Sequence, residues 1–299
     1  MKALAAYAMR GRSQAALLSS LFAVLSMVLP PFSYISGAIV ALVTMRRGVG
    51  EGALIAGFAT AALAVMSMIS SGNIVLAMVF AMMVWLPVWI LSVVLRKTVS
   101  MALMLAVATM QVLVVMVIFH IAVGDTIAWW NDVLSKVFAE TLGQPGMGEM
   151  SAMLENAPQF MTGLMGTAFF ASMILSVFLA RWWQAALYHP GGFREEFHGI
   201  RLDRTAAMVG AAVIVLAFIS ASPGSLIVDV AIMTGIYASV FGVALVHHWV
   251  SETEAHKAWL ILMYLLLAFV APQILVVLAI VGLADAWLNI RRFYQKTTS

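Results

Sequence analysis

The chain has 299 residues, of which 64% are hydrophobic and 10% are charged, and its mean hydropathy is +1.03. A soluble domain has about 25% charged and 45–50% apolar residues, so this composition excludes a water-soluble globular protein and predicts a protein embedded in lipid. The net charge of +3 comes from basic residues that separate apolar runs without forming a patch, which argues against nucleic acid as a partner, and the lack of cysteine excludes disulfides and thiolate sites.

Ten apolar segments follow one another along the chain, and each is expected to be helical. A spanning helix needs about 20 apolar residues to cross roughly 30 Å. The basic N-terminal flank precedes an apolar run without a cleavage site, which predicts a retained first helix. The segments are residues 14–28, 32–45, 50–69, 74–95, 99–123, 159–179, 205–219, 226–246 and 258–290, the last of which Pro272 divides in two. The pattern predicts an all-α polytopic transmembrane helix bundle of about eight to ten membrane segments, forming one integral membrane domain over residues 1–299.

Prolines interrupt the apolar pattern near both ends of the chain. Pro30 and Pro31 end the first segment, because proline lacks an N–H donor and restricts the residue before it. The second segment, residues 32–45, reaches only about 21 Å as a helix. It must therefore be tilted, shielded by protein or only partly inserted. Pro272 has the same effect in the last apolar block.

The basic residues decide the predicted orientation. With both termini in the cytoplasm, only Lys136 lies on the outer side, and this asymmetry satisfies the positive-inside rule. The other 15 of the 16 basic residues are Lys2, Arg10, Arg12, Arg46, Arg47, Arg96, Lys97, Arg181, Arg194, Arg201, Arg204, Lys257, Arg291, Arg292 and Lys296.

A polar interlude at about 124–158 lies on the predicted outer side. Within residues 128–142, apolar side chains recur at i, i+3, i+4, i+7 and i+8, which indicates an amphipathic helix. One interpretation is a helix on the membrane surface, anchored by Trp129 and Trp130. The other is a lid over an outward-facing cavity. A second polar loop, at about 188–204, is predicted to be cytoplasmic.

Two stretches carry a family resemblance. Their distinctive residues are Pro30-Pro31, Gly37, Arg46-Arg47-Gly48 and Gly52 in the first stretch, and Pro190-Gly191-Gly192-Phe193 with Glu196-Phe197 in the second. With these residues the chain resembles the YybS-like bacterial integral membrane family of unknown function. That family is distantly similar to the substrate-binding components of energy-coupling-factor transporters and to MreD-type proteins. The resemblance implies a transporter-like fold, but no substrate and no binding residues.

Ionisable residues at membrane depth are candidates for function, because an unpaired charge there costs several kcal/mol. Asp229, near the outer end of its segment, has no basic partner nearby in the sequence, and we weigh binding of a cationic group or a proton against a structural role. Gln111 lies near the middle of the fifth segment and suits an interhelical hydrogen bond or a ligand contact. His120 lies near the outer end of the same segment. These three are the candidate ligand-binding residues.

Other polar residues have a structural interpretation. We expect Glu51 to pair with Arg46 and Arg47, and Asp285 with the arginines that follow it. The motifs Gly48-x-x-x-Gly52, Gly57-x-x-x-Ala61 and Ala206-x-x-x-Gly210 permit close helix contacts. The residues assigned to structure or topology are Pro30, Pro31, Arg46, Arg47, Gly48, Gly52, Pro272 and Asp285.

A histidine-rich stretch closes the eighth segment. His248 and Glu252 are spaced as metal ligands on a helix can be. We favour the interpretation that these two residues, with His247, Glu254 and His256, form a solvated helix end. No metal and no cofactor are predicted. The chain has no Ser-His-Asp order, paired catalytic carboxylates or HExxH motif, so no enzymatic activity is expected.

The sequence thus predicts a multi-pass protein of the bacterial inner membrane. Our first hypothesis is a transporter-like component that binds or passes a small solute, since short broken segments often line binding sites. The alternative is a non-transporting scaffold or assembly factor of the cell envelope. The predicted partners are the lipid bilayer and other membrane proteins. Separate ATPase subunits would be needed for ATP-driven coupling, because the chain has no GxxxxGK[ST] motif.

Overall fold

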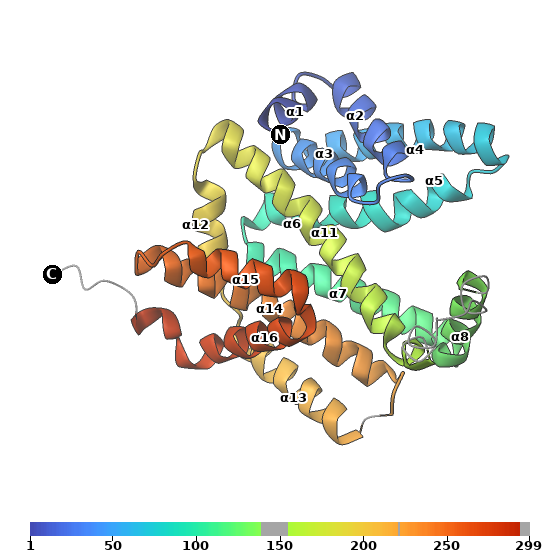
Figure 1. The fold of residues 1–299 in the computed structure, drawn as a ribbon. Coiled ribbons are helices and arrows are strands. Elements are labelled where there is room, and N and C mark those ends of the chain that lie inside the picture. The colour runs from blue at the N-terminus through green and yellow to red at the C-terminus, as the bar shows by residue number, and fades with distance from the viewer. Residues whose placement is uncertain (139–154, 221, 294–299) are drawn as a thin grey trace. The chain divides into compact units, whose positions relative to one another are not determined.

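The computed structural model describes residues 1–138, 155–220 and 222–293, and it contains helices and no β-strand in these ranges. The chain forms two compact units: Met1–Ala108 with Phe169–Phe197, and Thr109–Ala168 with His198–Ser299. The helices α7 (Met101–Val123) and α11 (Pro158–Tyr188) contribute to both units (Figure 1). The single domain expected over residues 1–299 stays a prediction.

All ten predicted segments are helical, which confirms the all-α prediction. Besides α7 and α11, they are α2 (Arg12–Leu25), α3 (Phe32–Arg47), α4 (Val49–Ser71), the continuous stretch of α5 (Val75–Phe80), η1 (Ala81–Trp85) and α6 (Leu86–Thr98), α13 (Arg204–Ser220), α14 (Leu226–Glu252), α15 (Ala258–Phe269) and α16 (Ala271–Leu288). Helix α8 (Thr126–Val137) confirms the described part of the predicted amphipathic helix, and the structure adds α1 (Lys2–Ala8), α12 (Gly192–Gly199) and η2 (Ile290–Phe293).

Several of these helices are long and apolar enough to cross a membrane. Within the described ranges there are six: α4, the α5–η1–α6 stretch, α7, α11, α14 and α16. A seventh results if α12 and α13, which meet at a bend of 59°, form one broken span. Helices α2 and α15 are apolar but shorter. The chain is therefore a multi-pass membrane protein with a polytopic helical fold.

Helix α3 is the core of the first unit. Every residue from Ser36 to Met45 is buried, so this helix is covered on all sides by protein. Helices α2, α4 and α6 pack around it. Buried hydrogen bonds tie the cluster together, because the Oγ of Ser36 donates to the carbonyl oxygen of Ser19 at 2.8 Å and accepts from Trp85 Nε1 at 3.0 Å. The short second segment is thus shielded by protein, one of the three options that its length left open.

Glycine closes the turn between α3 and α4. Gly48 has a φ of +130°, which L side chains rarely adopt, and it directly follows Arg47. One turn later, a Cβ on Gly52 would lie 1.8 Å from Thr44 Oγ1. The Gly48-x-x-x-Gly52 motif therefore allows α4 to fold back against the end of α3.

The fourth predicted segment contains a π-helical turn that the sequence analysis did not predict. The turn spans Ala81–Trp85 and precedes Pro87, which lies in the first turn of α6. Proline provides no N–H for the carbonyl group one turn earlier, and a π-helical turn is one way in which a helix accommodates such a defect. The turn carries Trp85, whose indole reaches the Ser36 hydroxyl.

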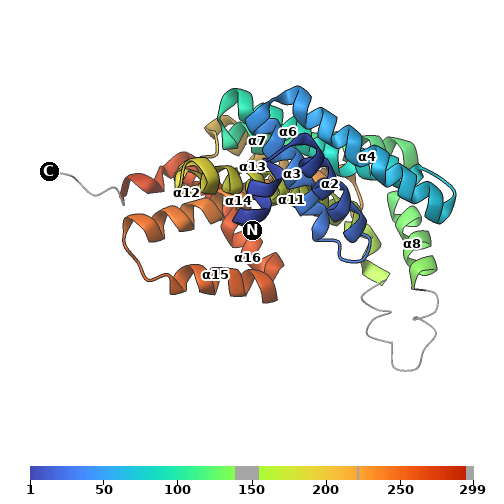
Figure 2. The same ribbon diagram turned by 90° about the horizontal axis from the view of Figure 1, so that it is seen from above.

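In the second unit, α14 and α16 cross at very short range, and both views show them side by side (Figures 1 and 2). A Cβ on Gly242 would lie 2.0 Å from the carbonyl oxygen of Leu278, and a Cβ on Gly282 would lie 2.3 Å from that of Ala238. Two glycines thus let the backbones touch. The predicted break at Pro272 is confirmed, since α15 ends at Phe269 and α16 begins at Ala271 with proline in its first turn.

Candidate functional site

A buried carboxylate lies at the start of α14. Asp229 is 1% exposed, in the first turn after Ser225, the residue that precedes the helix. Its Oδ1 faces Gly163 of α11, where a Cβ would come within 2.9 Å of that oxygen. Oδ1 and the Ser225 hydroxyl are both buried and lack a hydrogen bond of normal geometry within the described part of the chain. A carboxylate in this setting requires compensation from a nearby positive charge or a proton.

His120, in the last turn of α7, provides that compensation. Its Nε2 lies 3.3 Å from Asp229 Oδ2, and its side chain is 14% exposed. Asp229 has no basic partner nearby in the sequence, but the fold supplies one that is distant in sequence. The structure brings together two of the three predicted ligand-binding residues.

The surroundings of the imidazole define where protons lie. Nδ1 is 3.1 Å from the carbonyl oxygen of Met116, and Nε2 is 3.4 Å from that of Gly224. Carbonyl oxygens only accept hydrogen bonds, so the proton of Nδ1 points to Met116. Nε2 then faces the carbonyl oxygen of Gly224 and the carboxylate oxygen of Asp229. An unprotonated Nε2 would repel both oxygens, and a proton on Nε2 or on Asp229 relieves this repulsion.

Helix α8 covers this end of the second unit. Asp125 caps its N-terminus by accepting from Ala128 N at 2.9 Å. Thr126 donates to the carbonyl oxygen of Gly224 at 3.3 Å, the same oxygen that faces His120. Gly224 has a φ of +74°, and a Cβ there would lie 2.5 Å from the side chain of Ile127. The helix thus contacts the turn that borders the Asp229–His120 pair.

The two tryptophans of α8 have different surroundings. Trp130 is 9% exposed and donates from Nε1 to Thr162 Oγ1 at 2.9 Å, next to Gly163, while Trp129 is 40% exposed. The prediction that both side chains anchor the helix at the membrane surface is wrong for Trp130, which binds α8 to α11. Residues 139–142 of the predicted amphipathic stripe lie outside the described residues.

Gln111 does not join the pair. It lies nine residues before His120 on α7, about 13 Å along the axis and on the opposite face of the helix. Its Nε2 is buried and has no hydrogen-bond partner among the described residues. Gln111 is therefore not part of the site around Asp229.

A second buried carboxylate has a different environment. Asp285 accepts from Arg291 Nε at 3.0 Å, and Arg291 is 1% exposed. Arg291 also donates to the carbonyl oxygens of His198 and Ile200, the latter at 2.7 Å. Burial is the main cause that lowers the pKa of Arg291 from its ordinary value, and the hydrogen bond to Asp285 opposes it. The expected pairing of Asp285 with a following arginine is present.

Glu51 is paired with a residue that the sequence analysis did not consider. Its carboxylate accepts from Arg12 Nε at 2.7 Å. The expected partners bind elsewhere: Arg46 lies 3.9 Å above the ring centre of Tyr188, and Arg47 donates to the carbonyl oxygen of Met9. The prediction for Glu51 was wrong because α2 folds back onto the start of α4, a tertiary contact that spacing cannot reveal.

The histidine-rich end of α14 is part of the helix packing. His247 donates from Nδ1 to the carbonyl oxygen of Val243 at 2.9 Å, and its Nε2 lies 3.2 Å from the Tyr264 hydroxyl. His248 Nε2 is buried without a hydrogen-bond partner among the described residues. No group of three or more His, Cys, Asp or Glu side chains in those residues is arranged to bind a metal ion.

The residues that carry the family resemblance have structural contacts. Phe193 and Phe197 of α12 pack against Phe178 of α11, with ring centres 5.7 and 5.6 Å apart. Glu196 accepts from Arg181 Nε at 2.9 Å. Gly191 has a φ of +95°, which explains a glycine in this turn. These contacts fold the first part of the 188–204 loop onto α11.

Sequence reasoning missed several neighbours of the Asp229–His120 pair, namely Gly163, Gly224, Ser225, Thr126 and Thr162. One signal was present, since both members of the pair were placed near the outer ends of their segments and therefore at the same predicted depth. No protein-family model, curated protein or solved structure matches the chain.

Proposed function

We propose that the chain is a transporter-like component of the bacterial inner membrane that binds a small solute and couples its movement to the proton held by Asp229 and His120. The observation that carries the proposal is the buried Asp229 carboxylate, which lies in a long apolar helix, has no hydrogen bond of normal geometry in the described part of the chain and faces an imidazole. Ionisable side chains in such segments mark proton relays and ion pathways, because they are too costly to retain without a use.

The proton resides mainly on His120 in this proposal. Both ring nitrogens face carbonyl oxygens, so an imidazolium donates from Nδ1 to Met116 and from Nε2 to Gly224, and its charge lies 3.3 Å from Asp229 Oδ2. Loss of the proton leaves a carboxylate without a positive partner, and this cost drives a rearrangement at the outer end of α7 and α14. Such a pair has two states separated by one proton, which is the requirement for coupling.

Helix α8 is the lid in this proposal. It contacts Gly224 through Thr126 and α11 through Trp130. A movement of α8 would therefore expose or cover Asp229 and His120. The unpaired oxygens of Asp229 and Ser225 are the positions that a polar or cationic group of a solute would occupy. With both termini cytoplasmic, as we propose from the basic residues, this site opens to the outer side.

The scaffold alternative is less favoured by the geometry. A scaffold would act through helix faces and the 188–204 loop, and in that loop Phe193 and Phe197 pack against Phe178 instead of facing a partner. The relation to YybS-like proteins remains part of our proposal, and with it separate ATPase subunits as partners. We propose no enzymatic activity.

The test is a solute screen that is read at two pH values. Purified protein in nanodiscs is heated with each member of a panel of amino acids, vitamins and metal ions, at pH 6 and pH 8. We expect at least one solute to raise the melting temperature of the wild type by an amount that differs between the two pH values. Asp229→Asn and His120→Gln should abolish that shift, whereas Asp132→Asn, an exposed carboxylate on α8, should retain it.

Positive solutes are then tested for uptake into proteoliposomes with and without a pH gradient. Uptake that depends on the gradient and on Asp229 supports the proposal. A panel without any stabilising solute, or a response that Asp229→Asn leaves intact, contradicts it.

A further inference from the structure

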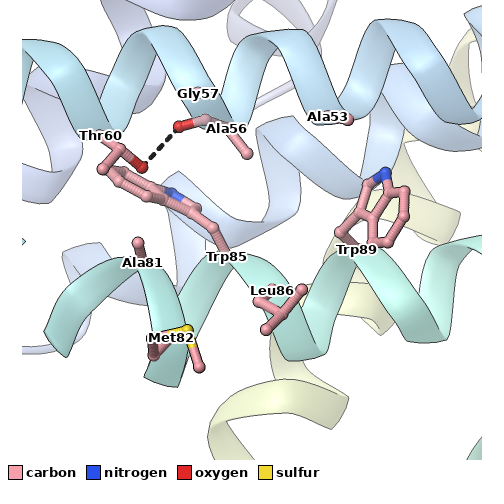
Figure 3. Close-up of a pocket in the computed structure, with 9 residues that line it drawn as sticks. All are labelled: Ala53, Ala56, Gly57, Thr60, Ala81, Met82, Trp85, Leu86 and Trp89. Carbon is pink, nitrogen blue, oxygen red and sulfur yellow. Dashed lines mark hydrogen bonds between the residues drawn. The ribbon is translucent and has the colours of Figure 1, made fainter. Parts of the chain in front are cut away.

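A groove of about 250 Å³ opens in the first unit, between α4 and the α5–η1–α6 stretch. Its α4 wall consists of the small residues Ala53, Ala56, Gly57 and Thr60, and the opposite wall carries the rings of Trp85 and Trp89 (Figure 3). The predicted contact motif Gly57-x-x-x-Ala61 therefore borders open space, and a Cβ on Gly57 would meet no other atom within 4 Å. The groove can therefore hold part of another molecule.

The polar side chains in the groove are already engaged. Thr60 donates to the carbonyl oxygen of Ala56 at 2.8 Å, as the dashed line in Figure 3 shows. Trp85 Nε1 donates to Ser36 and Trp89 Nε1 to the carbonyl oxygen of Val49, both at 3.0 Å. A polar solute would find no free partner there. Moreover, the volume is below the ~300–1,000 Å³ of sites that enclose a drug-sized ligand. The groove therefore suits one apolar chain that enters from the bilayer.

Positive charge is concentrated at one end of the groove. Trp89 is hydrogen-bonded to Val49, which directly follows the Arg46-Arg47-Gly48 turn. Arg96 donates to the carbonyl oxygens of Met45 and Thr44, which brings the end of α6 to the end of α3. We call Arg46, Arg47, Arg96 and Lys97 the basic rim. Clusters of this kind attract the anionic headgroups of the cytoplasmic leaflet.

We propose that the groove binds an acyl chain of an anionic phospholipid, with the phosphate of that lipid at the basic rim. The apolar groove and the basic rim lie next to one another at the ends of α4 and α6. The groove matches the acyl chain of such a lipid, and the rim matches its phosphate. A second copy of this chain is disfavoured as the occupant, because copies in one membrane share their orientation and would bring two basic rims together.

The test measures lipids retained by the purified protein in nanodiscs that contain equal amounts of phosphatidylglycerol and phosphatidylcholine. Native mass spectrometry counts each lipid on wild type and variants. Gly57→Trp fills the groove, and we expect bound phosphatidylglycerol to fall about tenfold, since each excluded methylene group accounts for about fourfold in affinity. Lys97→Gln should lower the preference for phosphatidylglycerol about fivefold.

Two variants are matched controls. Gly50→Trp places the same side chain on α4 outside the groove lining, where a Cβ also meets no other atom, and Lys136→Gln removes an exposed charge in the other unit. Both should retain the lipid. The proposal is overturned if Gly57→Trp keeps its phosphatidylglycerol, if both lipids are retained equally by the wild type, or if Gly57→Trp converts a dimer to a monomer without loss of lipid. None of these readouts depends on Asp229 or on solute binding.

Discussion

Two buried aspartates in the second unit are neutralised in different ways. Each carboxylate has an oxygen without a hydrogen bond in the described part of the chain, but Asp285 faces Arg291, which also binds two carbonyl oxygens, whereas Asp229 faces His120. Arginine remains charged under all physiological conditions, while histidine gains and loses its proton near neutral pH. The first pair is therefore a fixed link and the second can change state. This difference is why we assign structure to Asp285 and function to Asp229.

The largest effect is expected from removal of the fixed cation. Arg291→Met leaves Asp285 buried without a positive charge and the carbonyl groups of His198 and Ile200 without a donor. Breaking a buried ion pair costs about 3–5 kcal/mol of unfolding free energy. Thermal unfolding followed by circular dichroism should show a large loss of stability. Arg292→Met is the control, because that side chain is exposed, and equal losses in both variants would contradict the assignment.

The second prediction compares the two carboxylates directly. Asp285→Asn leaves a buried guanidinium that cannot lose its proton, and we expect a loss of about 3 kcal/mol. Asp229→Asn leaves an imidazole that becomes neutral, so the loss should be about 1 kcal/mol. Unfolding of both variants at pH 7, under identical detergent conditions, measures the difference. The comparison breaks down if Asp229→Asn is as destabilising as Asp285→Asn.

The third prediction concerns the close approach of α11 to the Asp229 carboxylate. Gly163→Ala places a methyl group within 2.9 Å of Asp229 Oδ1 and of Ile232 Cδ1. We expect a loss of about 1–2 kcal/mol from crowding, together with a weakened response to any solute that stabilises the wild type. Gly235→Ala on α14 meets no atom within 4 Å and should change neither property.

The smallest effect is expected at an exposed carboxylate. Asp203 Oδ2 accepts from Thr205 N at 2.8 Å and from Ala206 N at 3.3 Å, and these backbone donors at the start of α13 hold the pKa of Asp203 below its usual value of 3.8. The folded state thus gains stability from this carboxylate above pH 3.8, and that gain is lost as the pH falls through the lowered pKa. Asp203→Ala should lower the melting temperature slightly and equally at pH 5 and pH 7. A difference between these two pH values would contradict the account.

The helices were predictable because length and hydropathy decide them in a lipid-soluble chain. The short segment at residues 32–45 indicated its own shielding, and Pro272 indicated the break between α15 and α16. The π-helical turn was missed because Pro87 lies within an apolar run that otherwise continues a helix. The pairing of Glu51 with Arg12 was missed because it depends on how α2 folds back onto α4.

The candidate site was predictable only in part. Asp229 and His120 were identified separately, because charged and polar groups are rare in apolar segments. Their contact joins residues 109 positions apart, and Gly163 enters from a third helix. No periodicity connects these positions, so only the tertiary structure reveals that the two side chains lie 3.3 Å apart.

The most direct test of the central claim is the protonation state of His120, measured by ¹⁵N NMR on histidine-labelled protein in nanodiscs at pH 7. His120→Gln assigns the resonance. The account predicts that both ring nitrogens carry a proton in the wild type and that Nε2 loses its proton in Asp229→Asn. A singly protonated ring in the wild type, or the same doubly protonated ring in both proteins, would contradict it.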